Sequence, residues 1–272
     1  MAVRSALINV MTAAALKAAR GLIRDFGEVE QLQVSVKGPG DFVTQADLKA
    51  EKVLRAELSR ARPGYGFLME ESGVTPGSDT RHRWIIDPLD GTTNFLHGIP
   101  QFCISIGLER DGELVAGVVY EPVRDEMFWT EKGQGAYVND RRLRVSARRQ
   151  LAESVIATGI PTLRGTVDRE LYMRTLAAVM GATVGVRRFG AAALDLAYVA
   201  AGRVDGFWEF GLQPWDMAAG ILLIREAGGY ISGLRDGKRD LMASGDVVAA
   251  NDHLHLPLAA LLKDAIKGAA TS

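Results

Sequence analysis

The sequence predicts an α+β protein in which helices pack between sheets. First, apolar residues between Leu7 and Phe26 recur at helical spacing, so we expect an amphipathic helix at the start of the chain. Second, apolar strand patterns flank Asp111-Gly112, a dipeptide typical of a β-hairpin turn. Third, helical and strand-like segments alternate after residue 145. This mixed order differs from a regular βαβ series and favours sheets that are partly antiparallel.

In the first half of the chain, a second helix is predicted from Gln45 to Arg60. Thr44 is a suitable N-cap for it, and Pro63-Gly64 follow its end. A short helix is expected to begin at Thr92. Strands are predicted in the segments "GFLMEES", "RWIIDP", "FCISIGLER", "ELVAGVVYEP", "EMFWTEKG" and "GAYVNDRRLRVS".

In the second half, strands are predicted in "ESVIATGI", "TVGVRRFG", "VDGFWEF" and "YISG". The predicted helices are Arg169 to Met180, Ala191 to Ala201, "WDMAAGILLIREAGG" and Leu256 to Lys267. We therefore expect an N-terminal α+β half, residues 1–145, and a C-terminal α/β half, residues 146–272, that pack as one unit.

The composition is that of an ordinary globular protein. Hydrophobic residues make up 47% and charged residues 24% of the 272 residues. The 32 Lys and Arg balance 33 Asp and Glu, so the basic excess of a typical nucleic-acid binder is missing. The basic run "RRLRVSARRQ" is interpreted as a solvated loop, with nucleic-acid contact as the weaker alternative. We therefore predict no nucleic-acid partner.

Cys103 is the only cysteine, which excludes an intramolecular disulfide and favours a reducing compartment. Its neighbours, "QFCISIGL", indicate a buried strand and hence a core thiol rather than a nucleophile. No apolar run reaches the ~18–20 residues of a membrane helix, and an amphipathic first helix is preferred over a cleaved signal peptide. The sequence thus predicts a cytoplasmic protein without a membrane partner.

The segment "WIIDPLDGTTNF", Trp84 to Phe95, carries two aspartates just after a buried strand. Unpaired carboxylates at a buried edge are unfavourable, so a cation is expected beside Asp87 and Asp90. Pro88 steers Asp87 toward extended geometry, and Gly91 permits a sharp bend. The helix that follows would present free backbone N–H groups, which attract an anion, particularly phosphate.

Other acidic residues also close a predicted strand or open a predicted helix: Glu70-Glu71 and Asp216, with Asp47 as a looser candidate. Clustered carboxylates repel one another and would repel a phosphate, and divalent cations remove both conflicts. The motif offers oxygen ligands without His or Cys, so Mg²⁺ is favoured over Zn²⁺. Taken alone, each acidic segment also has a simpler explanation as a turn, a solvated loop or a helix N-cap.

Together these segments resemble the inositol monophosphatase family, in its bacterial SuhB-like branch. The matching stretches extend over nearly the whole chain and include "GDFVTQAD", "MEES", "WIIDPLDGTTNF", "LDLAYVAAGRVDGFWE" and "PWDMAAGILLIREAGG". The resemblance implies a layered αβαβα sugar-phosphatase fold, usually a homodimer. It also implies hydrolysis of phosphate monoesters with two or three Mg²⁺ ions per active site, and inhibition by lithium.

The resemblance implies a set of metal ligands on the matching residues. Glu70, Asp87 and the carbonyl of Leu89 would bind the first ion, whereas Asp87, Asp90 and Asp216 would bind the second. Asp90 is also implied as a substrate contact.

Catalytic and substrate-side roles follow from the same resemblance. Thr92, supported by Asp47, would orient the attacking water, and Glu70 is implied as a further catalytic residue. The N–H groups of Gly91 and Thr92 would hold the phosphate. Glu209 falls where the family places a carboxylate that binds substrate hydroxyls.

Two departures lie on the substrate side. Ala191 stands where relatives often carry Ser or Thr, and the loop Gly159 to Gly165 has no clear counterpart to the Ser-containing loop of the animal enzymes. We expect hydrolysis of inositol monophosphate, a small phosphorylated polyol. The alternatives are a fructose-1,6-bisphosphatase, a nucleotide 3′-phosphatase, a histidinol-phosphatase, or a regulatory binding protein on the same fold.

Overall fold

The computed structural model describes residues 4–28, 34–38, 41–160, 168–234 and 240–268, and for residues 34–38 and 41–43 it describes the backbone alone. The described helices are α1 Ala6–Phe26, α2 Gln45–Ala61, α3 Thr92–Leu96, α4 Arg169–Ala182, α5 Ala192–Ala200, α6 Pro214–Glu226, α7 Leu241–Ser244 and α8 His255–Lys267, with a 3₁₀ turn at Leu151–Glu153. The described strands are β1 Val34–Gly38, β2 Asp41–Thr44, β3 Tyr65–Met69, β4 Gly73–Thr75, β5 Asp79–Asp90, β6 Cys103–Arg110, β7 Glu113–Glu121, β8 Glu126–Glu131, β9 Gly135–Val138, β10 Arg141–Arg142, β11 Val155–Thr158, β12 Gly185–Arg187, β13 Gly206–Glu209, β14 Tyr230–Gly233 and β15 Val247–Ala250.

The strands form two main sheets. The first has eight strands in the order β10-β9-β8-β7-β6-β5-β3-β4, and all of its pairs are antiparallel except β3 with β5. The second has five strands in the order β12-β11-β13-β15-β14, in which β11 runs parallel to both of its neighbours. The expectation of partly antiparallel sheets is therefore confirmed. β1 and β2 form a separate hairpin.

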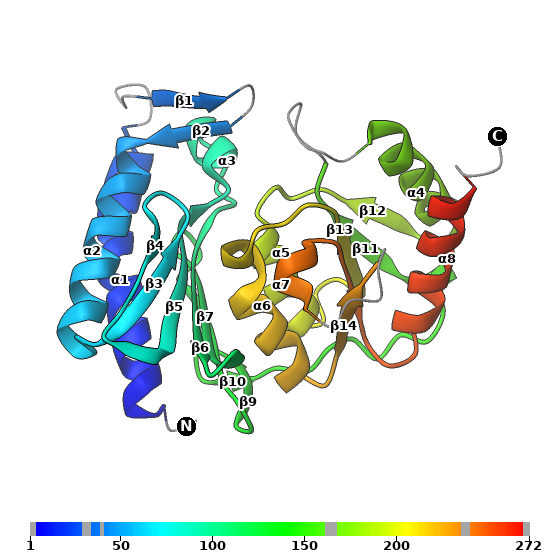
Figure 1. Ribbon diagram of the computed structural model, residues 1–272. Coiled ribbons are helices and arrows are strands. Elements are labelled where there is room, and N and C mark those ends of the chain that lie inside the picture. Colours follow the sequence, from blue (N-terminus) through cyan, green and yellow to red (C-terminus); the bar gives the residue numbers. More distant parts are fainter. Residues whose placement is uncertain (1–3, 29–33, 39–40, 161–167, 235–239, 269–272) are drawn as a thin grey trace.

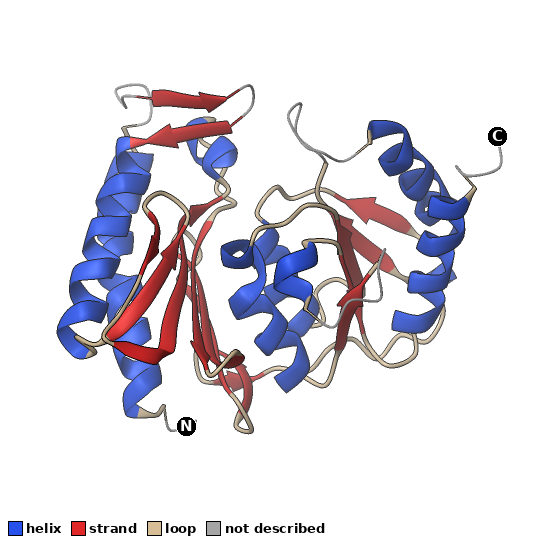
Figure 2. Ribbon diagram, viewed as in Figure 1, coloured by secondary structure: helices blue, strands red, loops and turns tan. Residues whose placement is uncertain are grey.

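The elements stack as helix, sheet, helix, sheet and helix (Figures 1 and 2). α1 and α2 cover the outer face of the first sheet, where they contact β7 and β5. α6 packs on β5, β6 and β7 from the other side, and α5 joins it to β11, β13 and β15 of the second sheet. α4 and α8 contact each other on the outer face of the second sheet. This is the αβαβα layering that the resemblance implied.

β5 is buried on both faces, which explains its continuous apolar run. Trp84 and Ile86 belong to the apolar cluster shared with α1 and α2, whereas Ile85 belongs to the cluster shared with α5 and α6. Side chains alternate across a strand, so one strand supplies both layers of the core. A third apolar cluster, with Trp208 and Leu258, lies under α4 and α8.

α1 is a core helix on one face. It begins after Ser5, whose hydroxyl accepts a hydrogen bond from the Ile8 N–H at 3.2 Å. By length and composition alone, Ala6–Phe26 is long and apolar enough to cross a membrane, so the expectation that no segment reaches this limit is wrong. In the structure, however, Ile8, Met11 and Leu22 are fully buried, and the helix packs on α2 and β7. This arrangement agrees with the predicted amphipathic helix.

The sequence predicted most elements close to their observed bounds. α2 has Thr44 as its N-cap, as predicted, and the hairpin between β6 and β7 turns at Asp111 and Gly112, which have φ angles of 53° and 80°. β5 begins at Asp79 and is longer than predicted. The strands β1, β2, β4 and β15 and the short helix α7 were not predicted. The division of the chain at residue 145 stays a prediction.

α6 approaches its neighbours closely because they meet at small residues. A Cβ added at Gly107 of β6 would stand 2.8 Å from the Cβ of Ala218, and one added at Gly220 would stand 2.5 Å from the Cβ of Leu196 in α5. Both distances are shorter than real Cβ contacts allow, so these glycines fix the depth at which α6 sits against the sheet.

We expect Gly220→Ala and Gly21→Ala to change stability in opposite directions. Both glycines lie inside helices, but a Cβ at Gly21 would meet no atom within 4 Å. Gly21→Ala should raise the free energy of unfolding by about 0.5–1 kcal/mol through helix propensity alone. Gly220→Ala should lower it by about 1–3 kcal/mol, because overpacking outweighs that gain. Urea unfolding of both variants checks this, and equal stabilisation by both would contradict the close packing of α6.

Candidate active site

Asp87 and Asp90 lie at the end of β5. The antiparallel register with β6 places Asp87 opposite Ser105 and Asp90 opposite Cys103, and the ladder is irregular between the two pairs. Within this irregularity, the Leu89 N–H donates a hydrogen bond to Asp87 Oδ1 at 2.9 Å. The strand therefore continues past Asp87, where the sequence predicted its end, and reaches Asp90 through this irregularity. Cys103 is the buried core thiol that the sequence predicted.

Glu70 stands beside Asp87. It follows β3, the parallel neighbour of β5, and its N–H donates to the Ile86 carbonyl at 3.2 Å. Burial raises the pKa of Asp87 well above its usual range, and the charge of Glu70 raises it further. A hydrogen bond between the two carboxyl groups acts in the same direction. Two residues 17 positions apart in the sequence are thus brought together by strand pairing.

Asp216 reaches the same place from the first turn of α6. The Gln213 N–H donates to Asp216 Oδ2 at 2.7 Å, so the carboxylate is held at the helix N-terminus. The Ser105 hydroxyl donates to the Trp215 carbonyl at 3.1 Å. Because Ser105 pairs with Asp87 across the ladder, this hydrogen bond fixes the start of α6 against the end of β5.

Neighbouring carboxylates raise the pKa values of Asp87 and Asp216. Burial raises the pKa of Asp216 well above its usual range, and the charges of Asp90 and Glu70 add to the effect. The pKa of Asp87 is raised by burial and by Glu70, Asp90 and Asp216. Such mutual repulsion requires that the four groups lie close to one another, and it leaves negative charge that a cation would offset.

Asp90 is held by the start of α5. Its Oδ2 accepts a hydrogen bond from the Ala193 N–H at 2.7 Å and lies 3.6 Å from the Cys103 Sγ. Burial raises the pKa of Asp90 to about 6, although the Ala193 N–H opposes the shift. The N-cap of α5 is Ala191, which provides no capping side chain. The Asp90 carboxylate caps the helix instead, because it accepts a hydrogen bond from one of the free N–H groups there.

Thr92 is linked to Asp47 across two helices. Its hydroxyl lies 3.2 Å from Asp47 Oδ1 and 3.0 Å from the Leu89 carbonyl, and its single proton can serve only one of them at a time. Asp47 is fully buried, and its other oxygen accepts hydrogen bonds from the N–H and the hydroxyl of Thr44. Burial raises the pKa of Asp47, while the hydrogen bonds from Thr44 lower it. The sequence assigned Asp47 only loosely, and the structure joins it to Thr92.

Gly91 occupies a position that requires glycine. Its φ of 94° lies in the left-handed region, and an added Cβ would stand 2.9 Å from the Gln101 carbonyl oxygen. It precedes Thr92, the first residue of α3, so the bend predicted at this point is present. Whether the N–H groups of Gly91 and Thr92 hold a phosphate stays a prediction.

Glu209 stands at the end of β13 and faces the site from the second sheet. A Cβ added at Gly159 would fall 1.9 Å from Glu209 Oε1, so the carboxylate lies directly against the backbone of that residue. Burial and the charge of Asp90 raise the pKa of Glu209 to about 8, whereas Arg188 lowers it. The negative charge of Asp90, a member of the acidic cluster, therefore also acts on Glu209. The rest of the predicted loop, residues 161–165, lies outside the described residues.

Sequence reasoning missed Asp195 and Arg188. Asp195 lies in α5, is 1% exposed, and its Oδ1 has no hydrogen-bond partner among the described residues. Burial raises its pKa well above the usual range, and the charges of Glu209 and Asp90 add to this. The available signal was a lone carboxylate in the apolar run "LDLAYVAA". Arg188 had no sequence signal beyond a pair of arginines.

The donors suit a hard divalent cation. Glu70, Asp87, Asp90 and Asp216 supply carboxylate oxygens, and Leu89 adds a backbone carbonyl, which is a ligand set typical of Mg²⁺. Within the described part of the chain, however, no three His, Cys, Asp or Glu side chains stand close enough to hold a metal ion as they are.

Comparison with known proteins identifies the family of the chain. Residues 4–267 match the inositol monophosphatase family. An inositol-1-monophosphatase of Mesorhizobium japonicum is 60% identical over 96% of this chain and 97% of its own length. A Nus factor SuhB of Pseudomonas aeruginosa is 44% identical over 90% of this chain and 91% of its own length.

The fold is also found among solved structures. The crystal structure of the extragenic suppressor protein SuhB from Bartonella henselae superposes with a TM-score of 0.92 at 58% identity, covering 95% of this chain and 99% of that one. Sequence and structure thus lead to the same assignment: the chain belongs to the inositol monophosphatase family.

Proposed function

We propose that the chain hydrolyses small polyol phosphate monoesters in a Mg²⁺-dependent reaction, with inositol monophosphate as the preferred substrate. The observation that carries this proposal is that strand pairing sets Glu70 beside Asp87 and that Ser105 holds the start of α6, with Asp216, against the same strand end, beside the bend at Gly91. Family membership and a relative named inositol-1-monophosphatase at 60% identity support it.

The metal ligands would be the four carboxylates and the Leu89 carbonyl, with two or three ions per site. Bound Mg²⁺ supplies positive charge that neutralises the phosphate and makes hydroxide available near neutral pH. The contribution of the chain is to aim its carboxylates at one place. Asp87, Asp90 and Asp216 each accept a backbone N–H bond, which limits how far they can rotate away.

Thr92 and Asp47 would orient the attacking water. An ionised Asp47 attracts the hydroxyl proton of Thr92, since a charged acceptor is stronger than the neutral Leu89 carbonyl. The lone pairs of the Thr92 oxygen are then free to accept a hydrogen bond from water. Glu70, at the same edge and next to Asp87, is the further catalytic carboxylate.

The substrate would lie between the two sheets. The N–H groups of Gly91 and Thr92 would bind its phosphate, and Glu209 and Asp90 would contact its hydroxyls. Arg188, whose charge acts on Glu209 and Asp195, adds a positive group on this side. This side holds the departures at Ala191 and the Gly159 loop, so fructose 1,6-bisphosphate, 3′-phosphoadenosine 5′-phosphate and histidinol phosphate are the competing substrates.

A regulatory role is a second candidate, because a relative at 44% identity is named a Nus factor. Such a protein would bind a partner while keeping the same fold, and it could retain hydrolysis as well. We further propose a cytoplasmic homodimer: the single cysteine, Cys103, fits a reducing compartment, and the dimer follows the family resemblance.

Phosphate release from a substrate panel tests the proposed function. With Mg²⁺ present, inositol 1-phosphate should be hydrolysed faster than the three competing substrates, and chelation or Li⁺ should suppress the reaction. A preference of more than about 100-fold for another substrate, or about 2.7 kcal/mol, would replace the assignment. Absence of release from every substrate by the folded protein would favour the regulatory role.

Two variants control this panel. Asp90→Asn removes charge from the acidic cluster and should lower kcat by at least about 100-fold, as losses of transition-state electrostatics do. Glu209→Gln should act mainly through KM, because its role is substrate binding. Equal losses of kcat in both variants would contradict this division of roles.

Thr92→Val is expected to lower kcat by about 100-fold, because it removes the hydroxyl that orients water while keeping the β-branched shape. Thr93→Val is the matched control, since Thr93 is the exposed neighbour on the same helix turn. Steady-state kinetics of both variants give the comparison. If Thr92→Val kept its kcat, the proposal that Asp47 orients the attacking water through Thr92 would be wrong.

Mg²⁺ should stabilise the protein more at higher pH. The pKa of Asp90 is raised to about 6, so the folded, metal-free protein binds more protons than the unfolded chain between the usual carboxylate range and pH 6. The stability of the metal-free protein therefore falls as pH rises through that window. At lower pH the carboxylates are protonated, and Mg²⁺ must displace these protons to bind. Melting curves with and without Mg²⁺ at about pH 5 and about pH 8 should show the larger gain in Tm at the higher pH. An equal gain at both values would contradict the assignment of these carboxylates as ligands.

A further inference from the structure

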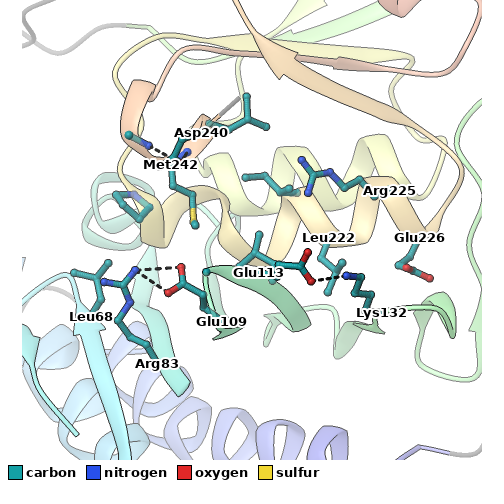
Figure 3. A pocket seen from close by; sticks show the side chains of 16 residues that line it. Leu68, Arg83, Glu109, Glu113, Lys132, Leu222, Arg225, Glu226, Asp240 and Met242 are labelled. Atoms are coloured by element: carbon teal, nitrogen blue, oxygen red, sulfur yellow. Dashed lines mark hydrogen bonds and ion pairs between the residues drawn. The ribbon is translucent and has the colours of Figure 1, made fainter. Parts of the chain in front are cut away.

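A cavity lies along α6 on the side of the first sheet. Its volume is about 810 Å³, and it opens between α6, α7 and the strands β3, β5 and β7 of the first sheet (Figure 3). This volume lies in the range of small-molecule pockets. The apolar part of its lining is Leu68, Leu114, Ile221, Leu222, Leu241 and Met242. We call it the α6 pocket.

The charged residues of the pocket wall on the side of the first sheet are paired. Arg83 forms an ion pair with Glu109 at 3.1 Å, and Lys132 forms one with Glu113 at 2.7 Å. Figure 3 shows both pairs along the lower edge of the pocket. These pairs leave no net charge on that wall.

The acidic residues at the two ends of the pocket accept backbone hydrogen bonds. Glu226 accepts N–H bonds from Gly133 and Gly135, both at 2.8 Å. Asp240 accepts the Met242 N–H at 3.1 Å and caps α7. Both carboxylates are therefore engaged in holding turns of the chain.

Arg225 differs from every other charged residue of the pocket. It lies in the last turn of α6, and among the described residues no hydrogen bond or ion pair joins its guanidinium to another group (Figure 3). Arg225 is exposed at the pocket mouth, and its partial burial lowers its pKa. A guanidinium without a partner beside an apolar surface is a binding group for a planar anionic group.

We propose that the α6 pocket binds a small amphipathic anion, with its apolar body on the leucine and isoleucine lining and its acidic group on Arg225. The metal site cannot take this role, because without a cation its carboxylates repel an anion. The two sites share α6, which carries Asp216 at one end and Arg225 at the other. The proposal does not depend on the catalytic assignment.

Titration with 8-anilinonaphthalene-1-sulfonate, followed by its fluorescence, tests the proposal. This probe combines an apolar ring system with one sulfonate. N-phenyl-1-naphthylamine is its neutral counterpart without the sulfonate. We expect saturable binding of the sulfonate probe at one site per chain, and Mg²⁺ with inorganic phosphate should leave it bound, because they occupy the other site.

Arg225→Met should weaken the sulfonate probe by about tenfold, the loss expected for one charge-assisted hydrogen bond, and leave the neutral probe unchanged. Arg60→Met, at a mostly exposed arginine of α2, is the matched control and should bind both probes normally. Ala243→Trp should fill the pocket and weaken both probes, since Ala243 lines it.

Normal binding of the sulfonate probe by Arg225→Met would overturn the proposal. Normal binding of both probes by Ala243→Trp would overturn it as well, because the probes would then bind elsewhere. Displacement by Mg²⁺ and phosphate would place the sulfonate in the metal site and have the same consequence. Thermal melting of each variant confirms that it is folded.

Discussion

Repulsion among buried carboxylates is the constraint on which the rest of the structure depends. The charges of Glu70 and Asp90 raise the pKa values of both Asp87 and Asp216, yet backbone hydrogen bonds hold Asp87, Asp90 and Asp216 in place. A carboxylate on a free loop would turn toward solvent and escape the repulsion. Here each side chain is fixed at the end of a strand or the start of a helix, so the unfavourable charge persists until a cation offsets it.

The fold maintains this arrangement through the depth of α6. Gly107 and Gly220 let the helix approach β6 and α5, and the Ser105 hydroxyl fixes its first turn to the sheet. A helix standing farther out would carry Asp216 away from Asp87, and the repulsion would weaken. The close approach of the carboxylates therefore lowers the stability of the metal-free protein and at the same time favours cation binding. Such a conflict between stability and function is common at functional sites.

Local signals predicted the metal side of the site and much of the fold. Asp87 and Asp90 could be found because a buried strand, a proline and a glycine surround them within one short segment. The Thr44 cap of α2 and the Asp111-Gly112 turn were predicted for the same reason. The register that brings Glu70 beside Asp87 is a tertiary property, indicated in advance only by the position of each residue at a strand end and by the family resemblance.

The substrate side was harder to predict because its residues act through distant partners. Asp195 is one carboxylate in an apolar helix, and only the packed structure shows that its oxygen lacks a partner and that it feels Glu209 and Asp90. The same holds for Gly159, whose missing side chain makes room for Glu209. Arg188 moderates the negative charge there, and under the proposed function the balance between this arginine and the two carboxylates would decide which hydroxyl or anionic groups a substrate can present. A metal site built from adjacent turn residues can be recognised in sequence, whereas specificity that arises from three separate elements becomes visible only when the layers are assembled.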